Sequence, residues 1–209
     1  MKSLNSRFLG FAAMSVAACI ASMPAKASLV ADGVTYSLTE TTTANPSTDQ
    51  FTLGISGING SSDTEKGRYG VEALAFTTPT NFSFATFVST TSTNPTGYSS
   101  MVGGLNSMGC DGSGGFFCFK ANATPVAPAL PAGSSLSYVF TVTTSAAGSF
   151  SGYVPDLKIN WVGTNNNYDL VSQPITPTAV PLPAAAWLLL SGIAGMGAMA
   201  RRRRLTTAA

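Results

Sequence analysis

The stretch Ser135-Leu136-Ser137-Tyr138-Val139-Phe140-Thr141-Val142-Thr143 decides the fold class of this chain. Large apolar side chains alternate there with small or polar ones almost throughout, and a period of two residues is that of a half-buried β-strand. Thr, Val, Tyr and Phe also favour strands. We therefore expect a strand with Leu136, Tyr138, Phe140 and Val142 on its apolar face and Val139 on the other face.

Further runs of this kind recur between clusters of Ser, Gly, Asn and Pro, the residues that mark turns. They cover residues 29–38, 50–58, 69–77, 82–88, 115–120 and 152–161. No convincing amphipathic helix separates them. Seven or more short strands predict a mostly-β fold, a single antiparallel β-sandwich over residues 28–173, with a jelly-roll arrangement as one option. A signal peptide and one C-terminal transmembrane helix are expected to flank it.

The charges are segregated along the 209 residues, although the formal net charge is only +2. Seven of the eleven basic residues lie near the two ends. Residues 28–180 hold the other four and all nine acidic residues, which gives this part a net charge of −5. Such a domain repels phosphate backbones, so nucleic acid is not an expected partner.

Histidine is absent from the sequence, and only three cysteines are present. This composition removes the commonest general base and the Ser-His-Asp and Cys-His catalytic arrangements. It also removes zinc sites that need histidine or four cysteines. We expect no enzyme activity, no metal and no cofactor.

Residues 1–27 have the pattern of a secretory signal peptide. Lys2 and Arg7 form a basic start, residues 8–20 form an apolar core, and Ala25-Lys26-Ala27 offers a small-x-small cleavage site before Ser28. A thirteen-residue core is too short to span a bilayer as a helix. Val16-Ala17-Ala18-Cys19 resembles a lipobox, so lipidation at Cys19 stays an alternative to ordinary cleavage.

Residues 184–200 form an uncharged apolar run that is just long enough for a transmembrane helix. Arg201-Arg202-Arg203-Arg204 follows it at once, within the tail 201–209. The positive-inside rule predicts that this block stays on the cytoplasmic side. The preceding Pro-rich residues, 174–183, are expected to form a semi-rigid stalk and to contain a sorting motif.

Val180-Pro181-Leu182-Pro183-Ala184, followed by the apolar segment and the arginine block, resembles the VPLPA variant of the PEP-CTERM sorting signal. The resemblance covers about residues 180–204. It implies that an exosortase recognises this motif and removes the helix and tail. It also implies an inner-membrane-anchored intermediate, a final place at the cell surface or outside the cell, and an association with exopolysaccharide or biofilm matrix.

Cys110 and Cys118 are the cysteines that remain after ordinary cleavage of the leader. In an oxidising compartment we expect them to form a disulfide that closes a Gly-rich loop. A reactive pair is the alternative, but basic neighbours closer than Lys120 are lacking.

Other residues that could bind a ligand or carry out chemistry are more simply interpreted as structural. Asp63-Thr64-Glu65 is expected to be a solvated turn, without the pattern of a calcium loop. Trp161, Tyr153 and Tyr168 could stack on sugar rings, although aromatic residues more simply fill a core. Residues 39–47 and 89–100 are expected to be exposed loops, with glycan-bearing or adhesive segments as the alternative.

These features together predict a non-enzymatic exported surface or matrix protein that an exosortase sorts and cleaves, with polysaccharide as a further candidate partner. Two alternatives stay open. One is a polysaccharide-active enzyme that uses two carboxylates, and the other is a permanently anchored adhesin or lipoprotein.

Overall fold

The computed structural model describes residues 28–106, 109–163 and 171–179. Eleven strands make up this part of the chain, and it contains no helix. The strands are β1 (Ser28–Ala31), β2 (Val34–Thr42), β3 (Thr48–Ile58), β4 (Arg68–Thr77), β5 (Phe82–Thr90), β6 (Tyr98–Asn106), β7 (Gly109–Ala121), β8 (Ser134–Thr144), β9 (Asp156–Gly163), β10 (Val171–Pro174) and β11 (Thr178–Ala179).

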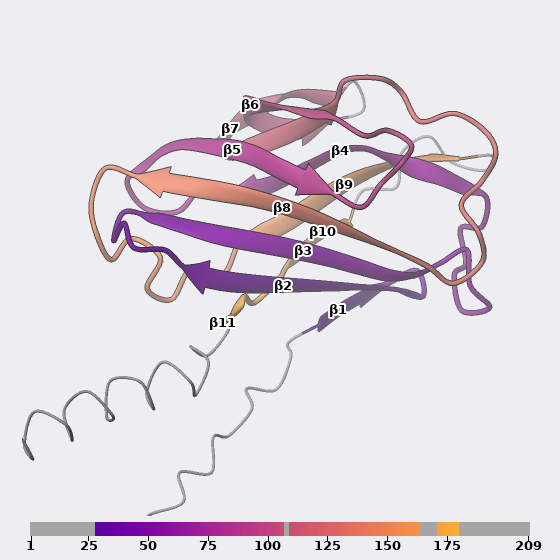
Figure 1. The fold of residues 1–209 in the computed structure, drawn as a ribbon, viewed down its shortest axis with the longest axis horizontal. Coiled ribbons are helices and arrows are strands. Elements are labelled where there is room, and N and C mark those ends of the chain that lie inside the picture. The colour runs from indigo at the N-terminus through magenta and orange to yellow at the C-terminus, as the bar shows by residue number, and fades with distance from the viewer. Residues whose placement is uncertain (1–27, 107–108, 164–170, 180–209) are drawn as a thin grey trace, which may run out of the picture.

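The strands form two antiparallel sheets, as the alternating sequence predicts. The first sheet has the order β1-β2-β3-β8-β5, and the second has the order β10-β9-β4-β7-β6. Figure 1 shows β2, β3, β8 and β5 side by side, with β4 and β9 behind them. The short strand β11 adds a parallel pairing to β2.

One hydrophobic core fills the space between the sheets. On β8, Leu136, Tyr138, Phe140 and Val142 are all buried, whereas Val139 is only partly buried, as predicted. Phe140 lies 4.8 Å from Phe76 of the opposite sheet, measured between ring centroids. Aromatic contacts of this kind add to the stabilisation from burial itself.

The polar ends of the buried aromatic residues find partners inside the core. The Tyr98 hydroxyl donates to the carbonyl oxygen of Val71 at 2.7 Å, and Trp161 Nε1 donates to the hydroxyl oxygen of Tyr36 at 3.2 Å. These bonds avoid the cost of leaving a buried donor unpaired. Trp161 is therefore a core residue and is not available to stack on a sugar ring.

The predicted run 29–38 is divided into two strands. Ala31 pairs with Val34 across a two-residue turn, Asp32-Gly33, in which both residues have positive φ, 51° and 78°. This is the backbone of a type I′ hairpin, for which Asp-Gly is a favoured pair. A Cβ at Gly33 would lie 1.6 Å from the carbonyl oxygen of Ser62, so close packing also requires glycine there.

Two expectations about exposed loops were wrong in part. The first four residues of the segment 39–47 belong to β2, and the segment 89–100 includes the end of β5 and the start of β6. Strand β6 was not predicted, because its sequence, Tyr98-Ser99-Ser100-Met101-Val102-Gly103-Gly104-Leu105-Asn106, lacks apolar alternation. Its pairing with β7 holds it in the sheet.

Candidate functional site

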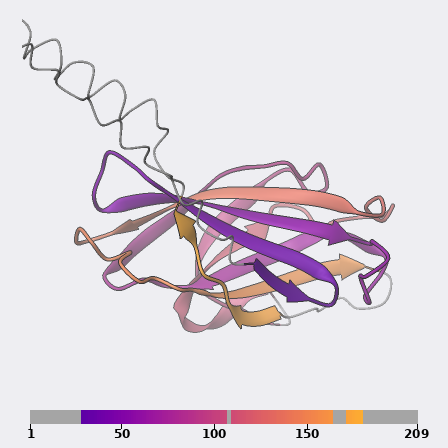
Figure 2. The same ribbon diagram turned by 90° about the horizontal axis from the view of Figure 1, so that it is seen from below.

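The two ends of the described domain lie at the same edge of the first sheet. Strand β1 begins at Ser28, the residue expected to follow the signal-peptidase site, and covers β2 from Val34 to Ser37. Strand β11 continues along β2, where Thr178 pairs with Thr39 and Ala179 with Glu40. Figure 2 shows this edge from below. Ala25 and Ala27 lie outside the described residues.

Residues 174–179, which we call the strap, are attached to the sandwich by specific contacts. Ile175 is only 1% exposed, and its backbone N–H donates to the carbonyl oxygen of Pro155 at 2.9 Å. The Thr178 hydroxyl donates to the carbonyl oxygen of Leu38 at 3.3 Å. The first six residues of the expected stalk thus lie against the domain, and the strap ends one residue before Val180.

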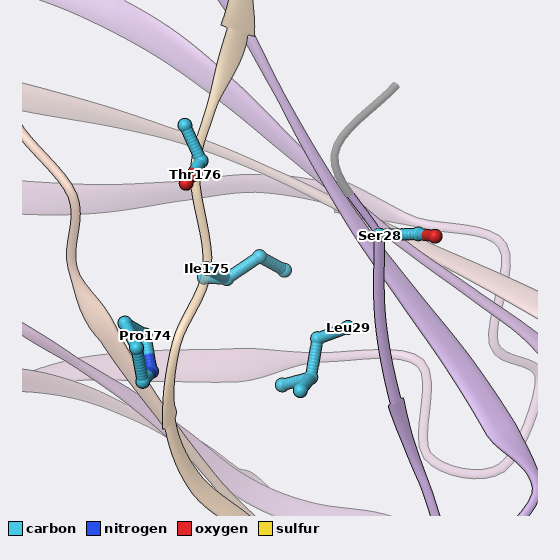
Figure 3. A pocket seen from close by; sticks show the side chains of 5 residues that line it. All are labelled: Ser28, Leu29, Pro174, Ile175 and Thr176. Carbon is cyan, nitrogen blue, oxygen red and sulfur yellow. The ribbon is translucent and has the colours of Figure 1, made fainter. Parts of the chain in front are cut away.

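A hollow of about 180 Å³ lies between the strap and β1. Its walls are Ser28, Leu29, Pro174, Ile175 and Thr176. In Figure 3 the side chains of Ile175 and Leu29 point toward each other across it. The volume is below the usual range for small-molecule sites, and the lining has no charged side chain. We assign this region to attachment of the strap.

The expected sorting residues lie beyond this attachment. The motif 180–184, the apolar segment 184–200 and the arginine block 201–204 are outside the described residues. Within the described part of the chain, no helix is long and apolar enough to cross a membrane.

Cys110 and Cys118 form the expected disulfide, with their Cα atoms 5.7 Å apart. Both cysteines are almost completely buried, at 3% and 0% exposure, and they pack with Ala73, Ala75 and Leu105. Eight extended residues would span more than 20 Å, so the chain between the cysteines folds back on itself. The disulfide thereby lies beside Ala73 and Ala75 of β4. Burial in an apolar cluster favours a structural role over a reactive one.

Asp63 is not part of a solvated turn, and that expectation was wrong. Its side chain is inaccessible and forms an ion pair with Arg68, Nε to Oδ2, at 3.2 Å. Arg68 also lies over the ring of Trp161, 4.9 Å from the centroid. The pairing could not be predicted from spacing alone, because it depends on the chain turning back between residues 59 and 68.

The pKa of Asp63 shows how completely its charge is compensated. Burial by itself would raise this pKa, but the hydrogen bond from Arg68 and the backbone N–H groups of Asn59 and Glu65 outweigh burial and lower it. The N–H of Asn59 lies 2.7 Å from Oδ2, and that of Glu65 lies 3.0 Å from Oδ1. This carboxylate is a structural anion with its hydrogen-bonding capacity in use.

Glu40 and Asp49 form a pair of carboxyl groups, which the sequence interpretation missed. Strands β2 and β3 direct both side chains inward, beyond Leu38 and Phe51 respectively. Burial, the hydrogen bond with Asp49 and the charge of Asp49 raise the pKa of Glu40 to about 7. The signal was present in the sequence, because Glu40 continues the even-numbered apolar positions 34, 36 and 38.

The surroundings of this pair do not resemble a cleft for a polysaccharide. Asp49 is 8% exposed and accepts a hydrogen bond from the backbone N–H of Thr43 at 3.3 Å. Tyr153, whose pKa is raised by burial and then by the charge of Glu40, donates its hydroxyl to the carbonyl oxygen of Thr77. Tyr153 also contacts Phe51, which assigns it to the core. Tyr168 lies outside the described residues.

A second hollow, of about 400 Å³, lies between the loops 93–97 and 122–126. Asn94 fastens the two loops together, since its side chain donates to the carbonyl oxygen of Val126 and accepts from the N–H of the same residue at 3.2 Å. Ser99 donates to Asn122 Oδ1 at 2.6 Å. The lining is uncharged and mixes polar residues with apolar ones such as Pro95 and Val126, so this hollow offers neither a catalytic carboxylate nor a charge for a ligand.

The described residues contain no group of three or more His, Cys, Asp or Glu residues that could hold a metal ion. No protein-family model matches the chain, and a search of curated proteins found no match either.

Proposed function

We propose that this chain is a non-enzymatic exported protein of the cell surface or extracellular matrix, associated with exopolysaccharide or biofilm. An exosortase recognises residues 180–184 and cleaves in or beside them. Until then, residues 184–200 hold the precursor in the inner membrane, with residues 201–204 on the cytoplasmic side. The leader 1–27 is removed before Ser28.

The observation that carries this proposal is the position of the strap. The folded domain extends to Ala179, which pairs with Glu40, and the sorting sequence begins at the next residue. Cleavage within residues 180–184 would therefore release a complete sandwich without cutting any described strand. The buried disulfide further supports an oxidising destination.

The strand connections support the jelly-roll option for the exported domain. The pairs β6–β7, β5–β8 and β4–β9 are nested within one another and alternate between the second sheet and the first. Such nesting is a feature of double-sheet Greek-key proteins.

The test expresses the full-length gene with and without an exosortase and measures the mass of the exported protein. We expect the C-terminus to end near residue 184 only when the exosortase is present. The double variant Pro181→Ala, Pro183→Ala should keep the whole tail, whereas the control Pro177→Ala should be processed. An unchanged C-terminal mass in both strains would contradict the proposal.

The same mass spectra identify the first residue of the exported protein. A chain that begins at Ser28 supports ordinary cleavage, whereas one that begins with a lipidated Cys19 supports the lipoprotein alternative.

A second candidate is an enzyme that uses Glu40 and Asp49 on a polysaccharide. A carboxyl group with a pKa near 7 is suited to act as a general acid. Its weakness is geometric, because the two carboxyl groups share a hydrogen bond and neither lines one of the two hollows described above.

A further inference from the structure

The outer side of the first sheet presents a regular array of hydroxyl groups. We define the hydroxyl face as the outward positions of three neighbouring strands: odd-numbered residues 35–41 of β2, even-numbered residues 48–56 of β3 and odd-numbered residues 135–143 of β8. Eleven of these fourteen positions are Ser or Thr, and the others are Gln50, Gly54 and Val139. Figure 1 shows these strands side by side.

The strand register arranges these hydroxyl groups in rows. Thr39 lies opposite Thr52, and Thr41 lies opposite Gln50, which in turn lies opposite Thr141. Neighbouring strands are about 4.8 Å apart, and successive side chains on one face of a strand are about 6.7 Å apart. The face is therefore a two-dimensional grid of hydroxyl groups. Some of them bond within the sheet, since Ser37 and Thr39 donate to the carbonyl oxygens of Gly54 and Thr52, but a hydroxyl group that donates can still accept.

The hydroxyl face carries no charge. About a quarter to a third of the residues on a soluble protein surface are commonly charged, but charged residues make up only 10% of this chain, so about one of the fourteen positions would be expected to be charged. The charged residues of the described domain lie elsewhere. Asp63 and Arg68 are buried together at one end, while Lys158 lies over Phe116 on the second sheet.

The face also lacks the side chains that anchor protein partners. Protein interfaces depend on a few buried Trp, Tyr or Arg residues surrounded by apolar contacts. The largest apolar side chain among the fourteen positions is Val139. The neighbouring strand β5 offers two exposed apolar side chains at the border of the face, Phe84 opposite Thr143 and Val88. The fourteen positions themselves offer a second copy of the chain neither a hydrophobic pocket nor an opposite charge.

We propose that the hydroxyl face binds a neutral polysaccharide. Each sugar unit carries several hydroxyl groups, so an uncharged polymer can form hydrogen bonds with successive rows of the grid. The Thr side chains are stiff at χ1, and little conformational freedom is lost when they bind. Acidic polysaccharides are disfavoured because the exported part has a net charge of −5.

The fourteen positions include no aromatic residue, and Phe84 of β5 is an exposed aromatic side chain at their border, which sets the expected mode of binding. Each hydrogen bond made in competition with water contributes little, so affinity arises from many simultaneous contacts along one polymer. Long chains should bind and single sugars should not. This inference adds a binding surface and a polymer class to the proposed function. It rests on that function only for the export of the chain to a place where polysaccharide is present.

The test uses the full-length chain, purified in detergent, with microcrystalline cellulose, dextran and galactomannan as neutral polymers and alginate as the acidic one. Salt is added to screen the basic residues of the leader and tail, which would otherwise attract alginate. We expect binding to at least one neutral polymer, weaker binding to its shorter fragments, and none to alginate. The triple variant Thr39→Val, Thr52→Val, Thr141→Val removes three hydroxyl groups but keeps the branched shape. Its apparent affinity should fall about tenfold or more.

A matched triple variant controls for loss of hydroxyl groups as such. Thr93, Thr96 and Thr124 are exposed and line the second hollow, away from the three strands. Replacing them with Val should leave binding unchanged, and circular dichroism should show that both variants are folded. Binding to alginate as tight as to the neutral polymers, no binding to any neutral polymer, or equal binding by both triple variants would overturn the inference.

Oligomeric state supplies a further readout. The wild-type chain could bind no polymer and form a dimer, while the triple variant at Thr39, Thr52 and Thr141 is a monomer. That result would assign the face to self-association instead. Polymer binding by the purified chain does not depend on processing. An unprocessed tail with retained binding would therefore refute only the proposed sorting, and normal processing without binding would refute only this inference.

Discussion

Replacing Asn59 with Ala should destabilise the domain more than most other substitutions outside its apolar core. The Asn59 side chain links three parts of the chain. Its Oδ1 accepts from the backbone N–H groups of Gly67 and Arg68, both at 2.9 Å. Its Nδ2 donates to the carbonyl oxygens of Arg68 at 3.0 Å and Leu130 at 2.7 Å. The same residue has a positive φ of 55°.

The magnitude follows from these contacts. Each intramolecular hydrogen bond contributes about 1 kcal/mol net, and the four bonds together about 4 kcal/mol. Asn59 is partly exposed, so water can hydrogen-bond some of the backbone groups that the variant leaves unpaired. The loss from the hydrogen bonds is then about 2–4 kcal/mol. Placing Ala at this positive φ adds about 1 kcal/mol, because Asn tolerates the left-handed region better than Ala through local hydrogen bonds of its side chain. We expect a total loss of about 3–5 kcal/mol, a large part of the stability of an ordinary domain.

Two variants separate the hydrogen bonds from the backbone effect. Asn59→Gly also lacks the side chain but accepts positive φ, so it should be less destabilising than Asn59→Ala by about 1 kcal/mol. Asn81 has a similar φ of 56°, and its side chain donates from Nδ2 to Ser149 Oγ over a longer distance of 3.4 Å. Asn81→Ala should therefore cost about 1 kcal/mol.

Urea unfolding at pH 7 measures these differences. Trp161 is buried and reports on the core, and a Trp187→Phe background removes the other tryptophan signal. Free energies are compared by linear extrapolation, with the urea slope checked for constancy. If Asn59→Ala lies within 1 kcal/mol of Asn81→Ala, the side-chain network does not stabilise this end of the sandwich and the reasoning is wrong.

Two further predictions concern the disulfide and the carboxylate pair. Replacing Cys110 and Cys118 together with Ser should lower the free energy of unfolding by about 2–3 kcal/mol, the loop-closure value for a short loop. Reductant should then no longer lower the melting temperature, and a large effect of reductant on the variant would contradict this account. Because the folded pKa of Glu40 is raised to about 7, its unfavourable ionisation is absent at low pH, and stability should fall as pH rises from about 4.5 to 7. Glu40→Gln should flatten this pH dependence, which melting temperatures measured at several pH values check. Release of reducing sugars from a polysaccharide by the wild type, but not by the Glu40→Gln variant, would support the enzyme alternative. Below about pH 4, protonation of Asp63, whose pKa is lowered, acts in the opposite direction.

Alternation predicted most of the first sheet. Positions such as Tyr138 and Phe140 repeat every second residue, and burial of one face of a strand requires such a repeat. The disulfide could also be predicted from the sequence, because Cys110 and Cys118 are close in sequence and belong to the expected exported part. Both predictions depend on local spacing.

Predictions that depended on distant contacts were less successful. Strand β6 has no alternating pattern, and its pairing with β7 places it in the second sheet. Asp63 looks like a turn residue, but Arg68 and the N–H of Asn59 make its burial possible. The Glu40–Asp49 pair was visible as an interruption of two apolar repeats, yet adjacent strands had to be registered before the two carboxyl groups could be placed together.

The sequence alone determined that this domain is built from strands with one apolar side, since side-chain alternation is a property of each segment by itself. It also determined the Ser/Thr composition of the other side. Only the tertiary structure decided that β2, β3 and β8 are neighbours, so that separate rows of hydroxyl groups become one uncharged face. It also decided that Ile175 packs beside β1 and brings the strap to the edge of that sheet. The physical reason is that pairing between distant strands depends on the burial of all their apolar faces at once, which no single segment specifies.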